Sequence, residues 1–221
     1  RYIYEFRELA PDFVIPPDFA TRIKFGSLEI ASDQPLSILA LRLTINQRSE
    51  TLLTTVPVAD MSQPTSSGPL FFPHIVDGGG FSTSVILLNT TNNTQSGMIR
   101  LYDESGVPLS LTSGGVTSSV FSYSIVPGAT YLLQTEGTTP GISVGSAQLF
   151  PNAGSTSPVG AGVFSMISGG VLASESGIPS AIPTTRARVF VDLTGGHDSG
   201  LAIAATSATA IPVTLQAFQN D

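Results

Sequence analysis

The chain repeats itself at a separation of 116 residues, so whatever fold one copy adopts is expected in the other as well. Gly79 and Gly80 lie over Gly195 and Gly196 at this shift. Without a gap, residues 85–90 then lie over residues 201–206, with apolar side chains at the same alternate positions. Ordered matches of this kind over most of a 221-residue chain predict a duplication.

Further matches define the borders of the repeat. Residues 99–102 lie over residues 215–218 at the same shift, and two more pairs match after small insertions: residues 25–27 with 144–146, and Val56-Pro57 with Ile178-Pro179. We predict module 1 at residues 1–105, a linker at 106–116 and module 2 at 117–221. An alternative register makes 71–180 the folding unit. Residues 1–60 and 186–221 would then be half-modules that complete each other or a neighbouring molecule.

Apolar and polar residues alternate with a period of two, which predicts strands. In residues 39–46, Leu39, Leu41, Leu43 and Ile45 alternate with more polar neighbours, so we expect this leucine-rich face to be buried and the other face to be wet. Similar runs occupy residues 27–30, 51–56, 83–89, 98–102, 119–125, 130–134, 146–150, 162–167, 189–192, 201–205 and 213–218. Most are bounded by Gly, Pro, Asn or Ser. The predicted fold class is all-β, as two tandem Ig-like or fibronectin-like β-sandwich modules.

Charge and composition exclude several classes of protein. Only 11% of residues are charged, the net charge is −7, and the nine Lys and Arg residues are scattered, so nucleic-acid binding is not expected. There is no Cys, which removes disulfides and thiol chemistry. No apolar run approaches the roughly 20 residues of a membrane-spanning helix. Both chain ends fall in the connecting segment of the repeat, which favours excision from a longer array.

Two runs resemble a known class of repeat. Residues 72–90, which contain Asp77-Gly78-Gly79-Gly80 before an apolar strand, and residues 103–109 resemble uncharacterised tandem repeat modules of secreted bacterial surface proteins. This resemblance implies export and an extracellular structural or adhesive role. It implies no catalytic residue and no particular ligand.

No catalytic constellation is predicted, so we expect a protein that is not an enzyme. The two histidines, His74 and His197, do not superpose in the repeat. His197-Asp198-Ser199 contains the residue types of a catalytic triad, but neighbours on an extended strand point to opposite sides. The matched glycines are expected to serve a turn that needs positive φ.

One metal site is an open alternative to simple turn formation. Asp103 and Glu104, with backbone carbonyls near Gly106, could offer oxygen ligands to calcium. In the second copy the corresponding residues are Gln219 and Asn220, which weakens a shared role for a metal. No other cofactor is expected.

The predicted function is a structural or assembly module of a surface protein or filament. It could self-associate through open sheet edges, for which residues 4–9 and 213–218 are the candidate strands. The alternative is a carbohydrate-binding or adhesion module. For that alternative Tyr102 and its repeat equivalent Phe218 are the candidate ligand-binding residues, since both are expected on the outward phase of their strands.

Overall fold

A computed structural model describes residues 25–207 and 210–218. Within these residues the chain is all-β, as predicted, and every strand pairing is antiparallel. The described part of the chain contains no helix, and so no helix able to cross a membrane. The chain divides into a unit that ends at Leu36 and a unit of residues 37–221, which holds every strand assigned among the described residues.

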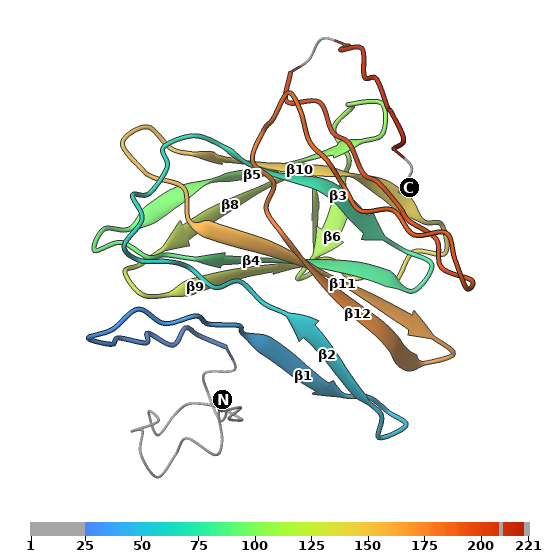
Figure 1. Cartoon of the computed structure of the whole chain (residues 1–221), viewed down its shortest axis with the longest axis horizontal. Helices are drawn as coiled ribbons and strands as arrows, with labels where there is room; N and C mark the ends of the chain where they lie inside the picture. The colour runs from blue at the N-terminus through green and yellow to red at the C-terminus, as the bar shows by residue number, and fades with distance from the viewer. Residues whose placement is uncertain (1–24, 208–209, 219–221) are drawn as a thin grey trace. The chain divides into compact units, whose positions relative to one another are not determined.

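Two four-stranded sheets form the body of the second unit (Figure 1). The first sheet has the order β3-β10-β5-β8, with β3 at Leu70–Asp77, β10 at Ser143–Pro151, β5 at Gln95–Asp103 and β8 at Val120–Ile125. The second has the order β12-β11-β4-β9, with β12 at Val171–Pro179, β11 at Val159–Ser168, β4 at Phe81–Leu88 and β9 at Thr130–Gln134. We call these two sheets together the sandwich.

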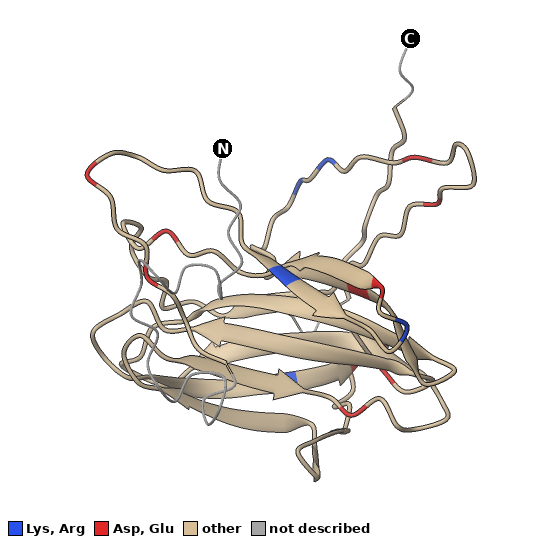
Figure 2. Ribbon diagram, turned by 90° about the horizontal axis from the view of Figure 1, so that it is seen from below, with Lys and Arg blue, Asp and Glu red and all other residues tan. Residues whose placement is uncertain are grey.

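The inner faces of the two sheets enclose one apolar core. Phe72, Leu87, Ile99 and Leu149 are all buried there, and each such side chain contributes about 1.5–3 kcal/mol of hydrophobic stabilisation. Gly160 faces the same space, where an added Cβ would lie 3.0 Å from the Phe72 ring. The few charged side chains lie mostly in loops and at strand ends (Figure 2).

Each sheet combines strands from both sides of residues 106–116, where the linker between the two modules was predicted. The short strands β6 (Leu111–Ser113) and β7 (Val116–Ser118) form a small separate hairpin at this point. The choice between the two module registers stays a prediction, as does the comparison with Ig-like domains.

The turn between β3 and β4 has the backbone that the matched glycines predicted. Gly79 and Gly80 have φ of 61° and 91°, and their repeat equivalents Gly195 and Gly196 have φ of 58° and 83°. These values lie in the left-handed region, which glycine enters at least cost. The prediction of a positive-φ turn in both copies is therefore confirmed.

A third layer is the N-terminal hairpin, formed by β1 (Leu41–Ile45) and β2 (Thr51–Thr55). Both strands were predicted, but the predicted burial of the leucine-rich face is wrong. Leu41, Leu43 and Ile45 are exposed, whereas Arg42 and Thr44 on the other face contact Glu175 of β12. The hairpin turns its polar face to the sandwich because β12 carries a carboxylate there.

The C-terminal segment, defined as residues 186–207 and 210–218, is extended chain without an assigned strand and projects away from the two sheets (Figure 2). Strands were predicted here at residues 189–192, 201–205 and 213–218, and none is present. The strand predicted at residues 27–30 is also absent. These runs have strand-like alternation, but none of them belongs to an assigned ladder among the described residues.

Candidate functional site

Tyr102 lies on β5 and points away from the core, as predicted, because its neighbours Ile99 and Leu101 point inward. It is half-buried and lines a shallow pocket of about 270 Å³. Met98, Arg100, Pro108 and Val120 line the same pocket. The tyrosine ring is therefore part of the wall of a shallow surface depression.

Phe218 lies far along the chain and is exposed. The guanidinium of Arg188 lies 5.0 Å from the centre of its ring, which is cation–π geometry. Among the described residues no ring contact joins Phe218 to Tyr102. The structure thus does not bring the two predicted ligand-binding residues together, and their role in binding stays a prediction.

Asp103 forms a turn with its own loop. Its Oδ1 accepts hydrogen bonds from the amides of Ser105, at 2.8 Å, and Val107, at 2.9 Å. Glu104 beside it is exposed, and residues 25–207 and 210–218 contain no group of three His, Cys, Asp or Glu side chains that could hold a metal ion. The calcium site at Asp103 and Glu104 stays a prediction, with one carboxylate oxygen already engaged by amides.

The two histidines lie in different settings. His74 packs edge-on against Phe164 between the sheets, at 5.0 Å between ring centroids. His197 is exposed, and its Nδ1 lies 2.9 Å from Asp192 Oδ2. The hydroxyl of Ser199 is engaged with the backbone of Asp192.

The contact between the N-terminal hairpin and β12 centres on Glu175. The side chain of Glu175 is 5% exposed and accepts hydrogen bonds from Arg42, from Thr44 Oγ1 at 2.7 Å and from Ser165 Oγ at 3.2 Å. A buried carboxylate is tolerated only when it is paired and hydrogen-bonded in this way. Sequence reasoning missed this residue because its partner Arg42 lies 133 positions away.

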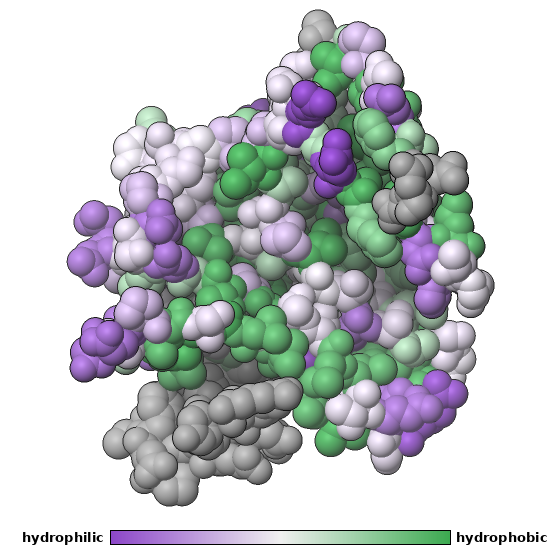
Figure 3. All heavy atoms as spheres, in the orientation of Figure 1, coloured by the Kyte–Doolittle hydropathy of each residue, from purple (hydrophilic) through white to green (hydrophobic). Residues whose placement is uncertain are grey.

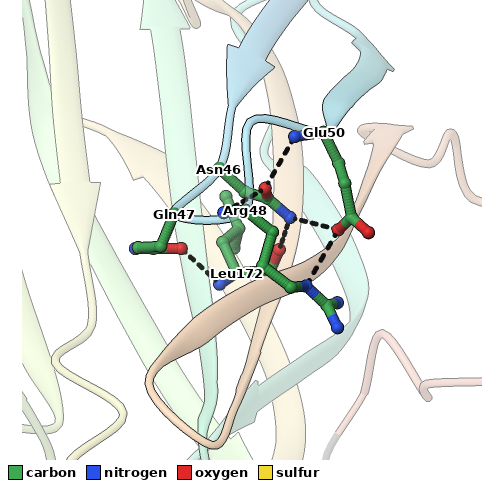
Figure 4. A network of polar contacts seen from close by, with 5 residues as sticks. All are labelled: Asn46, Gln47, Arg48, Glu50 and Leu172. Atoms are coloured by element: carbon green, nitrogen blue, oxygen red, sulfur yellow. Dashed lines mark hydrogen bonds and ion pairs between the residues drawn. The ribbon is translucent and has the colours of Figure 1, made fainter.

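The turn of the hairpin also holds the edge of β12 (Figure 4). Asn46 Nδ2 donates to the carbonyl of Leu172 at 2.9 Å, and the Leu172 amide donates to Gln47 Oε1 at 2.8 Å. Asn46 in turn accepts hydrogen bonds from the amides of Arg48 and Glu50, which keeps the turn compact. These side chains occupy backbone groups that an edge strand would otherwise leave open.

The C-terminal segment repeats the hydrogen bonds of the β3–β4 turn. In the sandwich the amide of Val76 donates to Thr83 Oγ1 at 2.9 Å, and that hydroxyl donates to the Val76 carbonyl at 2.8 Å. At the shift of 116 residues, the Asp192 amide donates to Ser199 Oγ at 2.8 Å, and that hydroxyl donates to the Asp192 carbonyl at 3.2 Å. The same local structure has formed twice.

A backbone hydrogen bond closes both turns in the same way. The Phe81 amide donates to the Gly78 carbonyl at 3.0 Å, and the His197 amide donates to the Thr194 carbonyl at 2.9 Å. Residues 192–199 therefore repeat these hydrogen bonds of residues 76–83, whereas the reciprocal bond from the Gly78 amide to the Phe81 carbonyl, at 2.9 Å, is formed only in the first turn.

The apolar side chains of the two copies differ in burial. Val85, Leu87 and Ile99 are 3%, 0% and 0% exposed, whereas their equivalents Leu201, Ile203 and Leu215 are 53%, 55% and 72% exposed. Figure 3 shows apolar atoms reaching the surface over both the C-terminal segment and the N-terminal hairpin. Residues 4–9, the other candidate edge strand, lie outside the described residues.

Comparisons of the chain with protein-family models, with curated proteins and with solved structures find no match.

Proposed function

We propose that the chain is a non-catalytic structural module of a secreted bacterial surface protein or filament, and that its copies associate through open strand edges. In this proposal the folding unit is a sandwich of residues 71–180, with an Ig-like or fibronectin-like character, and the flanking residues 1–60 and 186–221 are half-modules.

The observation that carries the proposal is the exposed apolar surface of the C-terminal segment. Its residues repeat those of β3, β4 and β5, which are buried in the sandwich, yet they have no sheet to cover them. Proteins that stay monomeric in water rarely leave large contiguous apolar patches exposed, and such patches commonly mark contacts with other proteins. An extended segment whose described residues belong to no assigned sheet is also suited to adding a strand to another sheet.

Light scattering on the purified chain across a wide range of concentrations tests this function. We expect the average mass to rise with concentration and to fall again on dilution. A mass that stays at one chain throughout would contradict a role in assembly. The same series with and without calcium tests the metal site predicted at Asp103 and Glu104.

A further inference from the structure

From the two incomplete regions we infer their partner: the C-terminal segment of one chain completes a second sandwich with the N-terminal hairpin of another copy of the same chain. This inference rests on the proposed function and specifies the surfaces that meet. It assigns a docking surface to the leucine-rich face and the open edge of β1.

The C-terminal segment supplies the strands that the hairpin lacks. Residues 197–204 are the repeat equivalent of β4, and residues 211–218 are equivalent to most of β5. In the sandwich, β4 lies between β11 and β9, and β5 lies between β10 and β8. The C-terminal segment has the β3–β4 turn already formed and none of these neighbours.

The N-terminal hairpin supplies the complementary part. It is followed by Val56-Pro57, as the β11–β12 hairpin ends in Ile178-Pro179. β11 carries β4 on the edge opposite β12, whereas β1 has only β2 as a neighbour. By this correspondence, residues 197–204 fit on the open edge of β1.

The repeat match places Leu43 over Ser165, on the face of β11 that points away from the core, so the exposure of the apolar faces, and not the match, decides which face of the hairpin meets the partner. The polar face of the hairpin is already covered, because Arg42 and Thr44 contact Glu175. The opposite face, with Leu41, Leu43 and Ile45, is uncovered and is the one that a second core would bury. The side chains offered by the partner include Ile203 and Leu215, whose equivalents Leu87 and Ile99 are core residues of the sandwich.

Within one chain the N-terminal hairpin and the C-terminal segment contact different sheets. The N-terminal hairpin lies on the outer face of the second sheet, against Glu175. The C-terminal segment contacts the first sheet at Gln148, whose side chain lies 3.5 Å from the Ala205 carbonyl, and much of the segment projects away from the sheets (Figure 2). Among the described residues the two parts share no strand pairing, so the open edge of β1 is left for the C-terminal segment of a second copy.

Such a contact joins two different surfaces and leaves one unused half at each end of every complex. A heterologous contact of this kind generates an open filament unless the rotation between subunits closes a ring. We therefore expect assemblies that grow head to tail, with no preferred size at the dimer.

Two blocked variants test the pairing. Leu43→Asp places a charge on the docking face of the hairpin, and Ile203→Asp places one in the C-terminal segment. Both residues are exposed, so the sandwich is expected to fold, as far-UV circular dichroism and thermal unfolding would check. The control is Gln216→Asp, whose equivalent Arg100 points away from the core.

Each blocked variant alone is expected to stay monomeric at concentrations at which the wild type and Gln216→Asp associate. An equimolar mixture of the two blocked variants should reach the mass of two chains and stop there. In each complex the unmodified C-terminal segment of one variant pairs with the unmodified hairpin of the other, and the two remaining surfaces are blocked. Blocked variants that associate like the wild type would overturn the pairing while leaving self-association intact. A mixture that stays monomeric or grows beyond two chains would also overturn it, and a monomeric wild type would remove the proposed function too.

Discussion

Residues 70–103 and the C-terminal segment are two copies of one sequence in two environments. Both form the same turn, with the same backbone hydrogen bond and the same hydroxyl contacts at Thr83 and Ser199. Only the first copy becomes strands of a sheet, because β9, β10 and β11 lie beside it. Turn geometry is thus set locally by glycine and hydroxyl residues, whereas strand formation depends on neighbours that the local sequence does not contain.

The loss in free energy of unfolding should differ most between the two copies when matched apolar side chains are truncated to alanine. Leu87→Ala opens a cavity in the core and should lower the free energy of unfolding by about 2–5 kcal/mol. Ile203→Ala at the equivalent exposed position should change it by about 0.5 kcal/mol or less in the dilute monomer. Urea unfolding at low protein concentration measures both. Equal effects would show that the C-terminal segment already has a core of its own.

Replacing the matched glycines by alanine should give a smaller difference in stability loss between the two copies. A Cβ on Gly80 would lie 2.2 Å from the Ile167 carbonyl oxygen, and φ there is positive, so Gly80→Ala combines a clash with backbone strain. A Cβ on Gly196 would have no atom within 4 Å beyond the adjoining residues, so only the strain of about 1–2 kcal/mol is expected, confined to the turn. Thermal unfolding should shift downward for Gly80→Ala and hardly at all for Gly196→Ala. A large shift for both would mean that the second turn is packed.

Removing the matched hydroxyl groups should give a still smaller difference in stability loss between the two copies. Thr83→Val leaves the buried amide and carbonyl of Val76 without their partner, which is expected to cost about 1–3 kcal/mol. Ser199→Ala removes the matching contacts where water can replace them, so the global stability should stay within about 0.5 kcal/mol. Denaturant titration of the two variants side by side would reveal whether the second contact is buried instead.

The smallest expected effect concerns a carboxylate that only the second copy has. Hydrogen bonds from the Thr194 hydroxyl and amide and from His197 lower the pKa of Asp192, whereas position 76 is Val. Because the pKa is lower in the folded turn, the contribution of these bonds is present above the ordinary pKa and is lost as the pH falls through the lowered one. An NMR titration should show this, and Thr194→Ala should raise the pKa. An ordinary pKa in the wild type would argue that the turn is not formed in solution.

The alternation of apolar residues predicted most strands of the sandwich but missed two. β3 contains Pro73, which is tolerated because β3 is an edge strand and the pairing with β10 shifts register at that point. β12 has a polar centre with Glu175, and such a sequence is typical of a loop. It can form a strand here because Arg42 of the N-terminal hairpin pairs with the carboxylate. The strands predicted in the C-terminal segment failed for the opposite reason, since their local pattern is strand-like but their partners are absent.

The candidate site was accessible from sequence only in part. The matched hydroxyls at Thr83 and Ser199 and the matched glycines lie at the repeat shift, so the copied turn could be inferred. The contacts of Glu175 and Leu172 with the hairpin could not, because they join residues more than 120 positions apart through tertiary packing. Gly177 is a further example: a Cβ there would lie 2.1 Å from the Thr55 carbonyl oxygen, a close approach that no local pattern encodes.

Hydrogen exchange at two protein concentrations tests most directly whether the second copy becomes a sheet by pairing with another chain. In dilute solution we expect slow exchange at the amides of residues 85–88 and fast exchange at residues 201–204, and at high concentration slow exchange at both and along β1. Fast exchange at residues 201–204 in the associated state would contradict completion of the second sandwich by a neighbouring copy, and slow exchange there in the dilute monomer would contradict it equally.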